Sequence, residues 1–147
     1  MKNIKGSLFY IITVAFLCFF SSCSKDRQIL VSTLWEAESM KVHADSNLIY
    51  SSGRSGWWKD TPVTLSFLKQ NKYLLHLEAN VIEGKVVIAN NSINFKEGSS
   101  TMVCCDSPFA ESCFYLMEEK INHYSINNEK LILMGEDGEA ITFFKQY

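Results

Sequence analysis

Short runs in which apolar and polar residues alternate recur along most of the chain. Alternation with a period of two is typical of a strand with one buried face. In VTLSFL, for example, Val63, Leu65 and Phe67 fall on one face. The runs that predict strands lie at 33–42, 63–68, 73–79, 85–89, 92–95, 121–126, 130–135 and 140–145. The sequence therefore predicts a mainly β domain.

The connections between several of these runs are short and carry turn-forming residues. Asn90-Asn91 separates two runs, and Asp137-Gly138 lies at the centre of EDGE between two others. Asn, Asp and Gly tolerate the positive φ angles of tight hairpin turns. Because such short turns can join only antiparallel neighbours, we expect an antiparallel sheet. The longest irregular stretch, 43–61, is rich in Ser, Gly, Asn and Asp.

One segment has the periodicity of a helix instead. Ser107 is a favourable N-cap, Pro108 a favourable first residue, and Glu111 falls in the first turn. Apolar residues then recur at helical spacing at Phe109, Cys113, Leu116, Met117 and Ile121. We predict one amphipathic helix over about 107–120. A single helix cannot cover both faces of a wide sheet, so we expect an α+β fold whose antiparallel sheet is strongly curved and barrel-like.

The N-terminus has the anatomy of a leader segment. Two lysines precede a continuous apolar run at 8–20, which is too short to span a bilayer comfortably. SSC follows, and small residues before Cys23 resemble the cleavage site of a bacterial lipoprotein signal. We therefore expect a signal peptide at 1–22, a lipidated Cys23, a tether at 23–32 and one domain at 33–147. The alternative is an ordinary secretory signal in which Cys23 has no role.

That leader implies a place in the cell. The protein would be lipid-anchored to a membrane of the cell envelope. We favour the outer membrane, with the protein on its periplasmic or surface side. Two of the 14 basic residues lie in the leader, so the remaining chain has 12 basic and 16 acidic side chains, a net charge of −4. Because no basic cluster is present to contact phosphates, nucleic acid is disfavoured as a partner.

Three cysteines in the predicted domain are the main candidates for chemistry. Cys104 and Cys105 are adjacent, and Cys113 follows inside the predicted helix. Their spacing does not match that of structural zinc sites, and no histidine stands in a recognisable nucleophile context. A disulfide suits an oxidising compartment best. With no acid–base pair, triad or phosphate loop, we expect no catalytic residues, no metal and no cofactor.

A second candidate site lies in the irregular stretch. Trp57 and Trp58 in SGRSGWWKD are flanked by Arg54 and Lys59. Exposed Trp favours interfaces, and the two cations would allow contact with a glycan or an acidic partner. Alternatively, at least one of the two indole rings closes the end of the barrel.

The series of motifs resembles the META domain, the family of HslJ. The matching residues run from Leu34 to Phe144 and include Trp35 and the Asn80 and Gly84 of EANVIEG. The longer pieces are PVTLSF, NSINF, SSTMVC, FYLMEEKINHYSI and KLILMGEDGEAITF. Ser100 replaces a threonine of the family pattern. The resemblance implies a link to stress tolerance or envelope maintenance, including resistance to some antibiotics.

One departure from the family pattern bears on the cysteines. Ala79 occupies a position where relatives often have a cysteine, so a family bridge to Cys104 is impossible here. We prefer Cys104 as a buried cysteine and Cys105–Cys113 as the bridge, with a vicinal Cys104–Cys105 bond as the alternative.

Taken together, these features favour a non-enzymatic, lipid-anchored envelope protein that acts by binding a partner. Two alternatives stay open. The curved sheet could hold a small apolar ligand in its mouth, or the domain could inhibit a hydrolase such as lysozyme.

Overall fold

The computed structural model describes residues 28–51, 61–127 and 129–147. The expected signal peptide at 1–22 and Cys23 lie outside the described residues, as do Arg54, Trp57, Trp58 and Lys59.

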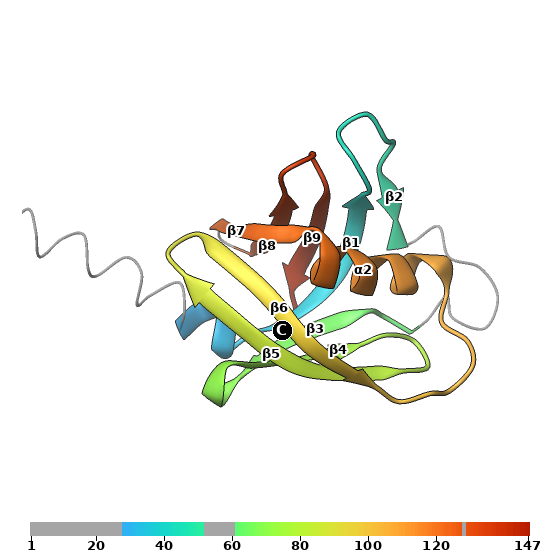
Figure 1. The fold of residues 1–147 in the computed structure, drawn as a ribbon, viewed down its shortest axis with the longest axis horizontal. Helices are drawn as coiled ribbons and strands as arrows, with labels where there is room; N and C mark the ends of the chain where they lie inside the picture. Colours follow the sequence, from blue (N-terminus) through green and yellow to red (C-terminus); the bar gives the residue numbers. More distant parts are fainter. Residues whose placement is uncertain (1–27, 52–60, 128) are drawn as a thin grey trace, which may run out of the picture.

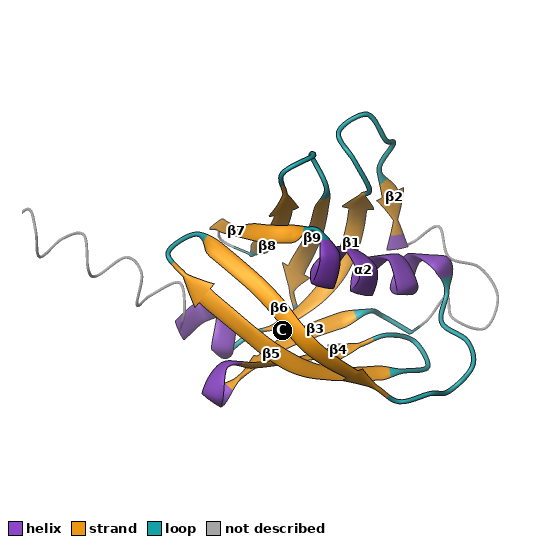
Figure 2. Cartoon of the chain, viewed as in Figure 1, coloured by secondary structure: helices purple, strands orange, loops and turns teal. Residues whose placement is uncertain are grey.

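Strands dominate the described part, as the alternating runs predict (Figure 1, Figure 2). The strands are β1 (Leu34–Lys41), β2 (Ile49–Tyr50), β3 (Thr64–Leu68), β4 (Lys72–His76), β5 (Val81–Ala89), β6 (Ser92–Ser100), β7 (Ile121–Asn127), β8 (Lys130–Gly135) and β9 (Ala140–Lys145). The main helix is α2 (Pro108–Glu119), and a short 3₁₀ turn, η3 (Lys69–Asn71), links β3 to β4. A helical turn at 28–31 precedes β1.

The sheet closes on itself. Its strand order is β2-β1-β3-β4-β5-β6-β7-β8-β9, every pairing is antiparallel, and β1 also pairs with β9 from Trp35↔Lys145 to Lys41↔Ala140. Eight strands thus form a barrel, and β2 adds to one side of β1. This confirms the expected α+β fold with a curved antiparallel sheet.

The barrel has one weakly paired seam. β6 and β7 share the residue pair Ser92↔His123, whereas β5 and β6 pair over most of their length. Helix α2, which connects these two strands, contacts both of them (Figure 1). The helix therefore completes the wall where the sheet hydrogen bonding is thinnest.

Apolar side chains fill the interior of the barrel. Trp35, Tyr73 and Phe143 are the largest fully buried ones, and inward-facing residues of all eight barrel strands join them. Small barrels of eight strands have an interior that side chains can just fill. The core of this protein is thus the barrel interior.

Local turn and cap chemistry is as predicted. Asn90 has a φ of 52° in a two-residue hairpin between Ala89 and Ser92, and Gly138 has a φ of 83°. Ser107 caps α2 by accepting a hydrogen bond from the Ala110 N–H at 3.2 Å, and Pro108 is the first helical residue. The buried face of the helix comprises Phe109, Ala110, Cys113, Leu116 and Met117.

The predicted alternation in β7 is wrong at one point. Ile121, His123 and Ser125 were expected on one face, but Ile121 is buried and His123 exposed. The register shifts between Ile121 and His123, so an extra residue enters the strand there. A bulge of this kind changes which side chains point inward, and Tyr124 is buried as a result.

Candidate functional site

Two segments that are distant in the sequence meet at one end of the barrel. They are the β4–β5 connection, 77–80, and the segment 101–107 that leads from β6 into α2 (Figure 1). We call these residues together the loop junction. It includes Asn80 and the segment of Cys104 and Cys105, which belong to the motifs that resemble the family pattern.

Asp106 is the centre of the loop junction. Its Oδ1 accepts hydrogen bonds from the backbone N–H groups of Glu78, Ala79 and Asn80, at 2.9, 2.6 and 3.3 Å. Its Oδ2 accepts from the Asn80 Nδ2 at 2.6 Å. Hydrogen bonds to an ionised carboxylate are stronger than those between neutral groups. Asp106 therefore fixes the shape of the β4–β5 connection.

Asn80 extends the same network to the other segment. Its Nδ2 donates to the Val103 carbonyl at 2.7 Å, and its Oδ1 accepts from the Val103 N–H at 2.8 Å. The Thr101 hydroxyl donates to that oxygen at 3.1 Å. The side chain thus pairs with the backbone as a strand neighbour would. This is a structural reason for an asparagine at position 80.

The carboxylate of Glu78 joins the β4–β5 connection to the helix. The Ser107 N–H and Oγ donate to the two oxygens of Glu78, at 2.5 and 2.8 Å. Because Ser107 also caps α2, Glu78 and the start of the helix are held in one arrangement. The loop junction is a rigid platform.

The cysteines are not placed as we preferred from the sequence. Cys104 and Cys105 are exposed and lie against each other as a close pair, and Cys113 lies buried in α2. The buried cysteine is therefore Cys113 and not Cys104, and the close pair fits the vicinal alternative rather than the Cys105–Cys113 bridge. The hydrogen bonds of Val103 and Asp106 hold the intervening pair at the surface, whereas Cys113 faces the core.

The surface of the loop junction is partly apolar. Met102 is 100% exposed and Val103 55% exposed, and the close pair Cys104 and Cys105 follows them directly. Exposed apolar side chains on an otherwise well-bonded loop are typical of contact surfaces. This strip, Met102–Cys105, is the part of the loop junction most available to a partner.

A groove of about 380 Å³ lies beside the loop junction, across the outer faces of β1, β3 and β4. It is lined by Leu34, Thr61, Pro62, Thr64, Ser66, His76, Leu77, Glu78, Ala79, Asn80 and Val81. Its walls combine hydroxyl groups and an imidazole with apolar side chains. Thr61 and Pro62 follow directly on the segment that contains the candidate binding residues Trp57 and Trp58.

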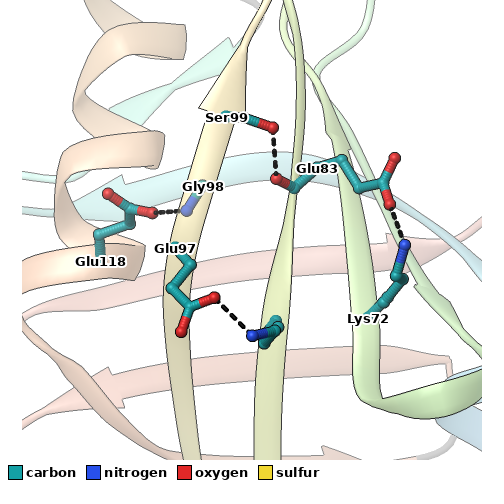
Figure 3. Close-up of polar contacts among 7 residues, drawn as sticks. Lys72, Glu83, Glu97, Gly98, Ser99 and Glu118 are labelled. Atoms are coloured by element: carbon teal, nitrogen blue, oxygen red, sulfur yellow. Dashed lines mark hydrogen bonds and ion pairs between the residues drawn. The ribbon is translucent and has the colours of Figure 1, made fainter.

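A separate contact ties α2 to the barrel wall. The Tyr73 hydroxyl donates to the Glu118 Oε1 at 3.3 Å. The Gly98 N–H donates to the same oxygen at 2.9 Å, as Figure 3 shows. Burial of the ring, and then the negative charge of Glu118 and its hydrogen bond, raise the pKa of Tyr73 well above its ordinary value. The exposed ion pairs Lys72–Glu83 and Lys85–Glu97 nearby contribute little to stability.

The raised pKa of Tyr73 predicts a loss of stability in alkali. An unfolded tyrosine ionises near pH 10. Since the folded pKa is higher, the contribution of Tyr73 is complete below about pH 10 and falls as the pH rises above it. We expect Tyr73→Phe to be less stable at pH 7 but to decline less steeply above pH 10, by up to about 1 kcal/mol per pH unit. Urea unfolding between pH 7 and 11 measures this.

Tyr115→Phe is the matched control, because Tyr115 is exposed on α2. Its alkaline decline should equal that of the wild type. Equal declines for Tyr73→Phe and the wild type would contradict the predicted role of Tyr73.

Two further kinds of feature are absent from the described residues. No group of three or more His, Cys, Asp or Glu side chains in 28–51, 61–127 and 129–147 is placed to hold a metal ion. In that same part of the chain, none of the helices has both the length and the apolar character needed to cross a membrane.

The fold defines a class of protein: a closed antiparallel barrel with one helix inserted before the last three strands. The family model of the META domain matches residues 28–147, and the chain therefore belongs to the META domain family. A search of curated proteins found none that matches.

Solved structures share the fold at low sequence identity. An NMR structure of a protein from Burkholderia xenovorans has a TM-score of 0.64 at 17% identity, over 81% of this chain and 85% of that one. The crystal structure of a DUF4847 family protein from Bacteroides vulgatus has a TM-score of 0.58 at 14% identity, over 82% of this chain and 98% of that one. At such identities the likeness concerns the fold alone.

Proposed function

We propose that this chain is a non-enzymatic protein of the cell envelope, lipid-anchored through Cys23, that contributes to stress or antibiotic tolerance by binding a partner protein. The observation that carries the proposal is the loop junction, where a rigid polar network presents the exposed strip Met102–Cys105 beside an open groove. The family resemblance supports the link to envelope stress.

The filled barrel favours binding at the outer surface. Trp35, Tyr73 and Phe143 occupy the interior together with the other core residues. A small apolar ligand in the barrel mouth would have to displace part of that packing. Cores at native density resist such changes, so the apolar-ligand alternative has less support.

The surface chemistry favours a partner with mixed character. Met102 and Val103 offer apolar contact, while Thr64, Ser66 and His76 in the groove offer hydrogen bonds. Interfaces between proteins typically combine an apolar centre with a polar surround. Arg54, Trp57, Trp58 and Lys59, which precede the groove residues Thr61 and Pro62 in the sequence, remain candidate contact residues.

The test has two parts in the native host. Metabolic labelling with an alkyne fatty acid should mark the wild type and not Cys23→Ser. Photo-crosslinking from position 102 should then capture an envelope protein, and Trp57→Ala/Trp58→Ala should reduce the yield. Crosslinking from position 50, where Tyr50 is half-exposed on β2, is the control.

Phenotype decides the biological role. Deletion should increase sensitivity to envelope stress or to antibiotics, and the wild-type gene should restore tolerance. A clean deletion without any such change would contradict the proposal. A lysozyme inhibition assay and native mass spectrometry of protein purified from its host would detect the two alternative functions.

A further inference from the structure

An apolar hollow lies at the end of the barrel opposite to the loop junction. Its volume is about 190 Å³, and apolar side chains of Val31, Phe67, Leu68, Val86 and Ile88 line it together with η3. η3 precedes β4 and the 77–80 connection follows it, so the hollow and the loop junction lie at opposite ends of that strand (Figure 1). The proposed partner-binding surface does not account for this hollow.

The rim of the hollow carries exposed apolar side chains beside the polar residues of η3. Val31 is 40% exposed and Leu68 39%. Lys69 is the one charged residue among the described residues that line the hollow. We call Val31, Leu68, Lys69 and Ile88 the tether-end rim.

The position of the chain start indicates what the tether-end rim faces. Val31 belongs to the helical turn with which the described chain begins at Gln28. Five residue steps separate Gln28 from Cys23, and at full extension they span at most about 18 Å. If Cys23 is lipidated, Gln28 lies within that distance of the bilayer surface, and Val31 of the tether-end rim follows it within the same helical turn.

The chemistry of the tether-end rim suits contact with a bilayer surface. Exposed aliphatic side chains gain free energy on entering the boundary between headgroups and acyl chains. A lysine beside them can place its stem along the apolar surface and its ammonium among lipid phosphates. Because the hollow lies at one end of the barrel, several of the side chains around it can contact the bilayer at the same time.

We propose that the tether-end rim rests on the bilayer, so that the barrel stands on the membrane with the loop junction directed away from it. This inference rests on the proposed lipid anchor. The nine residues of β5, Val81–Ala89, run from one end of the barrel to the other and span about 26 Å. Because strands in closed barrels tilt by about 35–45° from the barrel axis, the loop junction is presented about 20 Å above the lipid.

Depth-dependent quenching in vesicles tests the proposal. The full-length lipidated protein is reconstituted in vesicles of phosphatidylethanolamine and phosphatidylglycerol that contain spin-labelled lipid. A polarity-sensitive fluorophore is attached, without reductant, to Leu68→Cys or to Tyr115→Cys, the latter on the exposed face of α2. Side chains in the interfacial layer lie about 5–10 Å deep, so we expect at least about twofold stronger quenching at 68 than at 115.

The controls separate this inference from the anchor. Flotation of the vesicles reports anchoring, and protein that does not float overturns both proposals. Protein that floats but shows equal quenching at 68 and 115 overturns only the docking of the tether-end rim. Val31→Asp should lower the quenching at 68 toward the value at 115, and an unchanged value would show that the fluorophore inserts by itself, which also overturns the docking.

Discussion

Replacing Asp106 with alanine is expected to destabilise the domain by about 3 kcal/mol, because several donors would lose a charged acceptor at once. Three successive backbone N–H groups and the Asn80 amide donate to this carboxylate. Asp106 is half-buried, so water can satisfy only some of the N–H groups that would lose their acceptor. Equilibrium urea unfolding, followed by near-UV circular dichroism, measures the change in unfolding free energy.

Two further variants define the cause. Asp45→Ala removes an exposed carboxylate and should change stability by less than about 0.5 kcal/mol. Asp106→Asn keeps one acceptor oxygen but loses the charge, so we expect an intermediate loss. If Asp106→Ala were as stable as Asp45→Ala, the network would not be what holds the loop junction together.

Gly84→Ala is expected to cost about as much, roughly 3 kcal/mol, for a steric reason. A Cβ at position 84 would lie 2.5 Å from the Cε1 of Tyr73 and 2.8 Å from the Lys96 carbonyl oxygen. The Tyr73 ring is fully buried and the oxygen belongs to the neighbouring strand, so neither can move freely. Thermal and urea unfolding of the variant report the loss.

A double-mutant cycle identifies the obstructing group. In a Tyr73→Leu background the ring is absent, so Gly84→Ala should be less costly there than in the wild type. Part of the cost should remain because of the Lys96 carbonyl. Additive effects of the two substitutions would show that the ring is not the obstacle.

The elements of this fold were predictable because their signals are local. The alternation in VTLSFL and the cap at Ser107 each depend on a few neighbouring residues, and the structure has β3 and α2 at those places. The curved sheet followed from having many strands and one helix. The bulge after Ile121 broke a local pattern, since nothing in INHYSI marks an inserted residue, and a second register shift interrupts β1 between Ala37 and Ser39.

The site was less predictable because its contacts are distant in sequence. Asp106 and Asn80 are 26 residues apart, and no periodicity links a carboxylate before a helix to the backbone of a remote turn. The position of Asn80 was found through the family resemblance, but the roles of Glu78 and Asp106 were not. The same contacts misled the cysteine prediction, because they hold the segment of Cys104 and Cys105 at the surface.

The pairing of β1 with β9 has a consequence for how the protein is made. Trp35 near the start of the domain pairs with Lys145 near its end, so the barrel cannot close until almost the whole chain is available. A topology with such distant contacts folds slowly compared with one built from local contacts. Until the last strand is available, β1 keeps an open hydrogen-bonding edge. Loss of even the final strand would leave that edge exposed, and an exposed edge invites pairing with other chains.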